Sequence, residues 1–202
     1  MLERFRDAAA RMITPLARLL NARGVSPDLV TALGTVGVMS SALICFPQGW
    51  LWQGAVAVTF FVLADMLDGQ MAKMSGTASR WGAFLDSTLD RLGDAAVFGG
   101  ILWYFAYVRD QPVWALVCLV ALILGQLTSY VRARAESLGY AADGGVAARA
   151  DRLLVLLAGA VLAGFGVPYV LEAAMTFLAA AGAITVSQRI AHVHQQHRAG
   201  DG

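Results

Sequence analysis

The chain has 202 residues, of which 58% are hydrophobic and only 14% are charged, whereas about a quarter of the residues of a soluble domain are charged. So few charges cannot cover a water-soluble globule, so the composition excludes soluble, disordered and fibrous proteins. At about 20 residues per membrane crossing, the length allows six or seven short spans and no sizeable additional domain. The 15 basic and 14 acidic residues nearly cancel, so we expect no nucleic acid as a partner.

Residues 1–25 are predicted to form a basic amphipathic helix. Apolar residues recur at steps of three and four from Leu2 to Leu20, and most arginines lie off that stripe. Such a helix lies on the membrane surface. The alternative, a helix that packs on the rest of the protein from the soluble side, also places it at the interface. Ser26 and Pro27 follow as a helix start, because serine can cap a first turn and proline fits the first helical position.

The whole chain, residues 1–202, is expected to be a single all-α membrane domain with six transmembrane helices within residues 29–190. Six apolar segments support this expectation: 29–46, 51–66, 83–108, 113–131, 153–165 and 167–190. A tight turn is predicted from Gly164 to Pro168 between the last two segments. Cys45 and Cys118 lie inside apolar runs and are expected in the core, with no disulfide.

Basic residues are distributed unequally between the two ends of the predicted spans. With six spans both termini lie on one side, together with thirteen of the fifteen Lys and Arg residues, while Arg109 alone faces the other side. Positive residues favour the cytoplasmic side. We therefore expect a multi-pass protein of the cell membrane, with cytoplasmic termini and cytoplasmic connectors at 67–82 and 132–152. An odd number of spans would lose this asymmetry.

Five of the fourteen acidic residues fall within one stretch of 30 residues, namely Asp65, Asp68, Asp86, Asp90 and Asp94. An unpaired carboxylate near a bilayer costs at least a few kcal/mol. The first two are spaced i, i+3 and the next two i, i+4, so each pair shares a helix face. If the short connector brings the faces together, four carboxylates form an oxygen-ligand site suited to two Mg²⁺ or Mn²⁺ ions.

Other roles for these aspartates stay open at this point. Ion pairs could simply pin two helices together, and for Asp94 a pairing with Arg91 at i−3 is at least as plausible as a ligand role. A divalent-cation transport site is a third hypothesis. It is disfavoured because the carboxylates lie at the cytoplasmic ends of the spans, whereas transporter sites are usually built near the midplane.

The motif Asp65-x2-Asp68-Gly69-x2-Ala72-Lys73-x8-Gly82-x3-Asp86-x3-Asp90 resembles the signature of the CDP-alcohol phosphotransferase family. Every spacing agrees, and the one departure is Lys73, where the family usually has an arginine with its bidentate fork. The resemblance implies a membrane transferase, commonly a homodimer, that acts on a CDP-linked lipid such as CDP-diacylglycerol at the cytoplasmic face.

The same resemblance implies roles for individual residues. The four aspartates Asp65, Asp68, Asp86 and Asp90 would hold two divalent ions on the diphosphate, and Asp90 would also act as the base. The CDP part would be held by Asp28, Leu29, Val30, Thr31, Gly69, Lys73 and Ser79. Paired metals suit phosphoryl transfer, which depends on positioning and charge neutralisation.

The remaining arginines bear on the second substrate. Arg132, Arg134, Arg149, Arg152 and Arg189 lie near three predicted helix ends and could form a phosphate pocket, or they could contact lipid headgroups as ordinary cytoplasmic flanks. The sequence from Ser129 to Leu153 is similar to that of the actinobacterial phosphatidylinositol phosphate synthases. That similarity implies inositol 1-phosphate as the acceptor, held by Arg132, Arg152 and Arg189. A phosphatidylglycerophosphate synthase is the alternative within the family.

Overall fold

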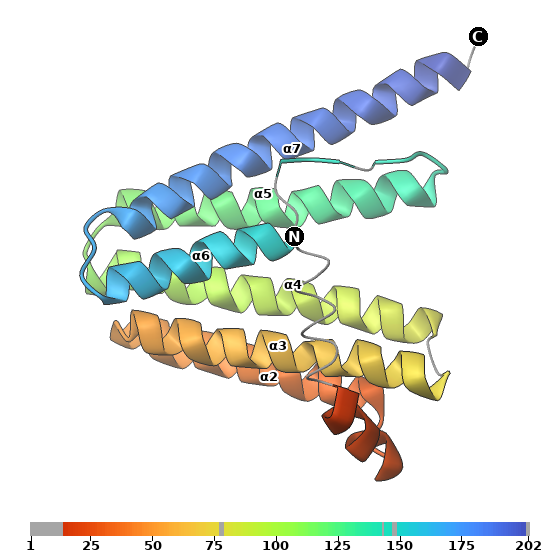
Figure 1. Ribbon diagram of the computed structural model, residues 1–202. Helices are drawn as coiled ribbons and strands as arrows, with labels where there is room; N and C mark the ends of the chain where they lie inside the picture. The colour runs from red at the N-terminus through yellow and green to blue at the C-terminus, as the bar shows by residue number, and fades with distance from the viewer. Residues whose placement is uncertain (1–13, 77–78, 143, 147–148, 201–202) are drawn as a thin grey trace.

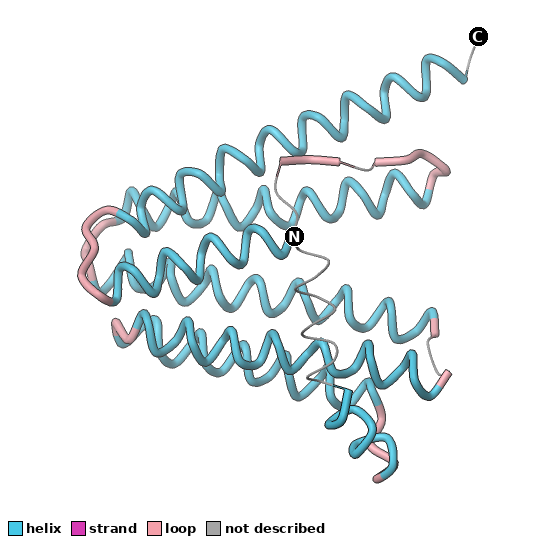
Figure 2. Tube along the Cα trace, in the orientation of Figure 1, coloured by secondary structure: helices cyan, strands magenta, loops and turns pink. Residues whose placement is uncertain are grey.

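The computed structural model describes residues 14–76, 79–142, 144–146 and 149–200. Every regular element in these ranges is helical, as Figure 2 shows. Most of the predicted amphipathic helix lies outside the described residues, which begin at residue 14. Residues 14–22 are helical and lead through a short turn into the first long helix.

The described chain then forms a bundle of long helices (Figure 1). Their bounds are α2 (Pro27–Cys45), α3 (Leu51–Ser75), α4 (Arg80–Trp103), α5 (Pro112–Ser137), α6 (Arg149–Gly164) and α7 (Val170–Gly200). A 3₁₀ turn, η1 (Phe46–Gln48), follows α2, and a π-helical turn, η2 (Tyr104–Val108), continues α4. Neighbouring helices pack in the order α2, α3, α6, α7, α5, α4 and back to α2. The helices thus close a ring.

The helix boundaries follow local sequence signals. The predicted start of α2 is confirmed, because the Ser26 hydroxyl accepts a hydrogen bond from the Leu29 N–H at 3.3 Å and Pro27 is the first helical residue. Ser79 caps α4 in the same way, accepting from the Gly82 N–H at 3.0 Å. The predicted turn after Gly164 is also confirmed, since α6 ends there and α7 begins at Val170.

Three helices continue well past the C-terminal ends of the apolar segments that predicted them. α3 runs to Ser75 instead of residue 66, α5 to Ser137 instead of residue 131, and α7 to Gly200 instead of residue 190. An apolar segment measures only the part of a helix that avoids water, and these three helices continue with polar and charged residues. As a result, Asp68 lies within α3 rather than in a connector.

The outer surface of the bundle is apolar over the middle of its helices. Leu33, Phe60, Leu116 and Leu154 on four different helices are each at least 60% exposed. α2 with η1, α3, α5 and α7 are long and apolar enough to cross a membrane, whereas α4 and α6 do not meet those criteria within the described residues. So much exposed apolar surface is incompatible with a soluble monomer. The chain is an integral membrane protein.

The buried core occupies the half of the bundle near η1 and η2. Phe46, Ile101, Phe105, Leu156 and Met175 are fully buried there. The grouped aspartates lie towards the other end, where α3 ends and α4 begins, and the arginines of α5, α6 and α7 lie at that same end of the bundle. A second small cluster of Ala17, Leu67 and Met71 holds the helical segment 14–22 against α3. Close packing at one end therefore supports the helix ends that carry the aspartates at the other.

Candidate active site

Three of the predicted ligand residues converge between α3 and α4. Asp65, Asp68 and Asp86 each offer a carboxylate oxygen, and these oxygens all lie within 4.8 Å of one another. Asp65 and Asp68 share one face of α3, as their i, i+3 spacing requires. Three negative groups so close together repel one another. A cation bound between them would remove that repulsion, and carboxylate oxygens are the ligands that Mg²⁺ and Mn²⁺ prefer.

The protein satisfies these carboxylates unevenly. Asp68 accepts hydrogen bonds from the Thr31 hydroxyl and from the Gly69 N–H. In contrast, Asp65 Oδ1 is buried and has no hydrogen-bond partner among the described residues. Gly34 of α2 faces this oxygen, and a Cβ there would lie 3.3 Å from it. A buried carboxylate oxygen without a donor needs another partner, so the residues present fit a divalent cation.

Asp90 is placed differently from the other three. It lies one turn beyond Asp86 on α4, and its Oδ1 forms an ion pair of 2.8 Å with Arg149 Nη1. Asp90 and Asp65 nevertheless line the same small cavity, together with Arg149. The structure thus groups three of the four predicted carboxylates and places the fourth beside them, held by an arginine from α6.

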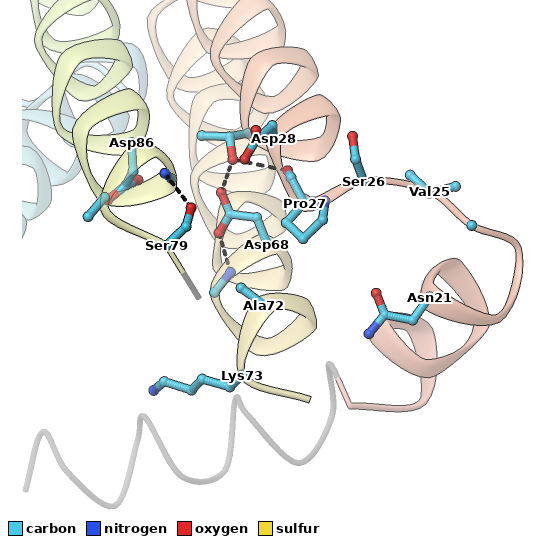
Figure 3. Close-up of a pocket in the computed structure, with 15 residues that line it drawn as sticks. Asn21, Val25, Ser26, Pro27, Asp28, Asp68, Ala72, Lys73, Ser79 and Asp86 are labelled. Carbon is cyan, nitrogen blue, oxygen red and sulfur yellow. Dashed lines mark hydrogen bonds between the residues drawn. The ribbon is translucent and has the colours of Figure 1, made fainter. Parts of the chain in front are cut away.

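A cleft of about 670 Å³ opens next to the three carboxylates (Figure 3). Its walls come from the turn before α2, the first turn of α2, the last turns of α3 and the first turns of α4. Five of the residues predicted to hold CDP line it with Asp68 and Asp86, namely Asp28, Thr31, Gly69, Lys73 and Ser79. The cleft therefore borders directly on two of the three carboxylates, those of Asp68 and Asp86.

The other two residues predicted to hold CDP do not line the cleft. Leu29 is 50% exposed on the outer surface of α2. Val30 packs against the small cluster that holds the helical segment 14–22 to α3. Neither side chain faces the cleft, because only one side of the first turn of α2 can do so.

Two polar contacts at the cleft were not predicted. Asn21 lines it and donates from Nδ2 to the Met71 carbonyl oxygen at 3.1 Å, which ties the N-terminal segment to α3. Trp81 Nε1 donates to Asp28 Oδ2 at 3.1 Å, which joins the starts of α4 and α2. Asn21 directly follows the apolar pair Leu19-Leu20. This position is a weak sequence signal that the Asn21 side chain faces the rest of the protein.

Two of the three predicted acceptor arginines meet at Thr128 of α5. Arg152 Nη1 donates to the Thr128 hydroxyl at 3.1 Å, and Arg189 Nη1 donates to the Thr128 carbonyl oxygen at 2.5 Å. Gly125 makes room for Arg152, since a Cβ there would lie 3.4 Å from its Nε. Arg132 is one turn beyond Thr128, is about half exposed and pairs with Glu136 at 2.8 Å. The structure therefore brings Arg152 and Arg189 together and leaves Arg132 nearer to solvent.

Comparison with known proteins identifies relatives along nearly the whole chain. Residues 24–187 match the family model described as CDP-alcohol phosphatidyltransferase. The phosphatidylinositol phosphate synthase of Cutibacterium acnes is 49% identical over 203 residues, covering 96% of this chain and 98% of that protein. The phosphatidylinositol phosphate synthase of Mycolicibacterium smegmatis is 45% identical over 188 residues, covering 92% of this chain and 85% of that protein.

Solved structures share the fold. The crystal structure of Mycobacterium tuberculosis phosphatidylinositol phosphate synthase (PgsA1) with CDP-DAG bound has a TM-score of 0.88 and 44% identity, covering 91% of this chain and 94% of that one. The same protein in complex with manganese and citrate has a TM-score of 0.86 and 45% identity, covering 90% and 88%. The family resemblance seen in the sequence is thus confirmed, and the solved relatives share the fold described above.

Proposed function

The chain belongs to the CDP-alcohol phosphatidyltransferase family and is a phosphotransferase enzyme, and we propose that it makes phosphatidylinositol phosphate from CDP-diacylglycerol and inositol 1-phosphate with release of CMP. The observation that carries this proposal is the grouping of Asp65, Asp68 and Asp86 beside a cleft lined by the predicted CDP-holding residues. Relatives that are 45–49% identical bear the name of this synthase, and one was crystallised with CDP-DAG bound.

We propose a divalent cation site formed by Asp65, Asp68 and Asp86, with Asp90 completing it and two Mg²⁺ or Mn²⁺ ions at full occupancy. The buried Asp65 oxygen without a donor supports a cation at this place, and a solved relative contains manganese. The metal would neutralise the diphosphate and stabilise the leaving CMP. Holding such a charge in place is what phosphoryl transfer chiefly requires of a protein.

In the proposed reaction Asp90 accepts the proton of the acceptor hydroxyl. Its Oδ1 is held by Arg149 at 2.8 Å, whereas its Oδ2 has only a longer ion pair of 3.7 Å with Arg91 and would take the proton. The acceptor oxygen then forms a bond to the lipid-side phosphorus, the bond from that phosphorus to the bridging oxygen breaks, and CMP leaves with the bonding electron pair. Because a carboxylate is a weak base, the hydroxyl has to be held within about 3 Å of it.

The cleft residues would bind and orient the CDP part. Lys73 is exposed at the cleft and can reach a phosphate as a point charge, without the bidentate geometry of arginine. Gly69 leaves open space, because an added Cβ would meet no atom within 4 Å apart from its chain neighbours and the backbone of its own helix turn, among the described residues. Such space allows a ligand to approach the backbone of α3 closely.

We propose that Arg152 and Arg189 bind the acceptor phosphate and that Arg132 joins them. The first two already meet at Thr128. Arg132 is four residues from Thr128 on α5, so it shares that face of the helix. Three guanidinium groups around one phosphate would provide several charge-assisted hydrogen bonds.

We further propose six membrane crossings in the cell membrane, with both termini and the active site on the cytoplasmic side, and a homodimeric enzyme. The ring of helices α2 to α7 supports six crossings. Large aromatic side chains are exposed at the end opposite the aspartates, among them Trp50, Tyr107 and Tyr169. Aromatic residues of this kind gather at membrane interfaces. Small residues along several helices are compatible with dimer formation.

The direct test is an assay of CMP release by the purified full-length protein. We expect release when CDP-diacylglycerol, Mg²⁺ or Mn²⁺ and inositol 1-phosphate are all present, and none when the cation is removed by a chelator. Each acceptor is supplied separately. Release with glycerol 3-phosphate alone would contradict the proposed acceptor and assign the chain to phosphatidylglycerophosphate synthesis.

A further inference from the structure

Asp94 lies one turn beyond Asp90 on α4, and only 9% of its side chain is exposed. It is neither one of the three grouped aspartates, Asp65, Asp68 and Asp86, nor one of the residues that line the cleft. A buried carboxylate is costly unless it is paired with charged or hydrogen-bonding groups. The partners of Asp94 therefore indicate why it is present.

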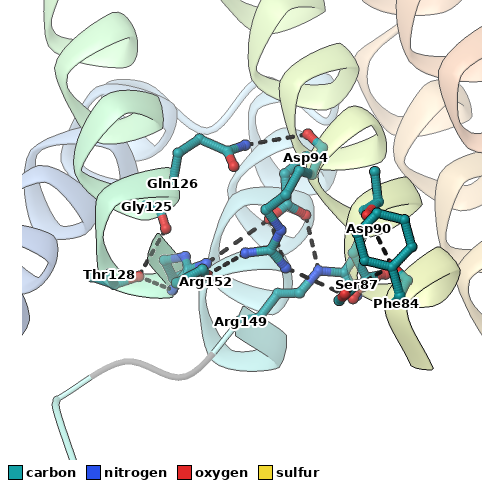
Figure 4. A network of polar contacts seen from close by, with 12 residues as sticks. Phe84, Ser87, Asp90, Asp94, Gly125, Gln126, Thr128, Arg149 and Arg152 are labelled. Atoms are coloured by element: carbon teal, nitrogen blue, oxygen red, sulfur yellow. Dashed lines mark hydrogen bonds and ion pairs between the residues drawn. The ribbon is translucent and has the colours of Figure 1, made fainter. Parts of the chain in front are cut away.

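Those partners are three arginines, namely Arg149 and Arg152 of α6 and Arg91 of α4 itself. Arg149 Nε donates to Asp94 Oδ1 at 3.1 Å, while Nη1 of the same guanidinium contacts Asp90 Oδ1 at 2.8 Å. Arg152 Nη2 forms a longer ion pair with Asp94 Oδ2, at 3.9 Å, which is beyond hydrogen-bond range. Figure 4 shows both arginines reaching from α6 towards Asp94. Arg91 Nη2, the partner expected from sequence spacing, lies 4.0 Å from Asp94 Oδ2, about as far away as Arg152 Nη2.

These contacts form a continuous polar network. It runs from Asp90 through Arg149 to Asp94, then to Arg152, and from Arg152 to Thr128, where Arg189 also binds. One end is the proposed base and the other end is the proposed acceptor-phosphate pocket. Asp94 is the carboxylate between the two arginines of α6.

We infer that Asp94 is a positioning residue, which orients Arg149 towards Asp90 and Arg152 towards the phosphate of the acceptor. This inference rests on the proposed function. The two arginines start adjacent turns of α6 and would repel each other if no anion lay between them. With Asp94 in place, the distance between the acceptor phosphate and the base is set by α4 and α6 together. Asp94 itself lies outside both the cleft lining and the group of three aspartates, so it acts through the arginines.

The inference predicts which kinetic constant changes when Asp94 is altered. In Asp94→Asn the amide cannot hold both guanidinium groups, so we expect the KM for inositol 1-phosphate to rise at least about tenfold, since truncating a buried charge pair has effects of that order. The KM for CDP-diacylglycerol should stay within about twofold, because the cleft is built from other residues. Asp94→Glu, which keeps the charge on a longer arm, should give an intermediate acceptor KM, about threefold above the wild type.

The assay measures CMP release by full-length protein, varying one substrate at saturating concentrations of the other. Glu172→Gln serves as the matched control, because Glu172 is also a buried carboxylate but lies in the first turn of α7, at the other end of the bundle. We expect both KM values of this control to equal those of the wild type.

The outcomes separate the inference from the proposed function. If the wild type is active only with glycerol 3-phosphate, the proposed acceptor is wrong, and the Asp94 variants are compared with that phosphorylated acceptor instead. An acceptor KM within twofold of the wild type in Asp94→Asn would overturn the positioning role. So would an equal rise of both KM values accompanied by a fall in Tm. If Asp94→Asn does not fold, a wild-type acceptor KM in Asp94→Glu overturns it.

Discussion

Asp65 is the residue at which the cation site can be tested most directly, because its buried Oδ1 has no donor among the described residues. In Asp65→Asn the amide keeps the size of the side chain and removes one charged ligand. We expect CMP release at limiting Mg²⁺ to fall about 100-fold or more. A higher Mg²⁺ concentration should restore part of the activity, which a titration of rate against Mg²⁺ measures.

The control for this substitution is Asp110→Asn. Asp110 lies between η2 and α5, at the end of the molecule away from the three grouped aspartates, and has a φ of 51°. Asparagine tolerates such a φ well, so the control changes the same charge without strain. Its Mg²⁺ titration should match that of the wild type. An Asp65→Asn enzyme whose titration also matches would rule out a ligand role for Asp65.

Asp90 is proposed both to complete the cation site and to act as the base, and the base role is the one that excess cation cannot replace. We expect Asp90→Asn to lower the rate of CMP release by a factor of about 10² to 10⁴, the usual contribution of a general base, and this loss to remain at saturating Mg²⁺. The amide oxygen can still accept a hydrogen bond from Arg149, so the Tm should change little. CMP release measured alongside thermal unfolding checks both points. Turnover above a tenth of the wild-type rate would exclude Asp90 as the base.

Sequence spacing predicted part of this site correctly. The i, i+3 and i, i+4 spacings place the aspartates on two helix faces, and the structure brings three of them together. The pairing of Asp90 with Arg149 could not be predicted, because it depends on α6 approaching α4 across the ring. Spacing within a helix determines which side chains share a face, whereas the arrangement of the helices determines which faces meet.

At the scale of the helices, the packing of α4 against α2 can be tested at Gly100, where the two backbones approach each other closely. A Cβ on Gly100 of α4 would lie 2.6 Å from the backbone oxygen of Ala42 on α2, whereas a Cβ on the neighbouring Gly99 would meet nothing within 4 Å. Gly100→Ala should therefore force the two helices apart. Overpacking of this kind costs about 1 to 3 kcal/mol, which corresponds to roughly 5 °C in Tm for a chain of this size.

Gly99→Ala is the matched control on the same helix. It adds the same methyl group to open space and improves helix propensity, so its Tm should be unchanged or slightly higher. Thermal unfolding of both purified variants in the same detergent gives the comparison. Equal Tm values for Gly100→Ala and Gly99→Ala would show that the close contact does not limit stability.

The apolar segments predicted the existence and order of α2 to α7, but not the lengths of all the helices. Arg132 to Ser137 extends α5, and the polar stretch from His192 to Arg198 extends α7. These residues have no apolar periodicity that would indicate a helix. They stay helical because a formed helix propagates more easily than it begins, and because Gln196 and His197 contact the connector that follows α5.

For the whole molecule, the ring arrangement bears on how α4 and α6 cross the membrane. α4 carries Asp86, Asp90, Arg91 and Asp94, and α6 has only 16 residues, about 24 Å of helix against a hydrocarbon core of about 30 Å. Yet α4 packs between α2 and α5, and α6 between α3 and α7. Lipid could adapt to the short α6 by local thinning, and Asp90 and Asp94 of α4 pair with Arg149 of α6.

If α4 did not cross, α5 would start on the same side as the end of α3, and Arg132 and Arg134 would face the other side of the membrane from Lys73. Cysteine labelling distinguishes the two topologies. In a Cys45→Ala, Cys118→Ala background, we expect a membrane-impermeant maleimide to label Asp110→Cys in intact cells, and to label Leu138→Cys and Ala199→Cys only after permeabilisation. Asp110 and Leu138 lie on successive connectors, so six crossings place them on opposite sides of the membrane. Labelling of Leu138→Cys in intact cells, or protection of Asp110→Cys, would therefore contradict six crossings with a cytoplasmic active site.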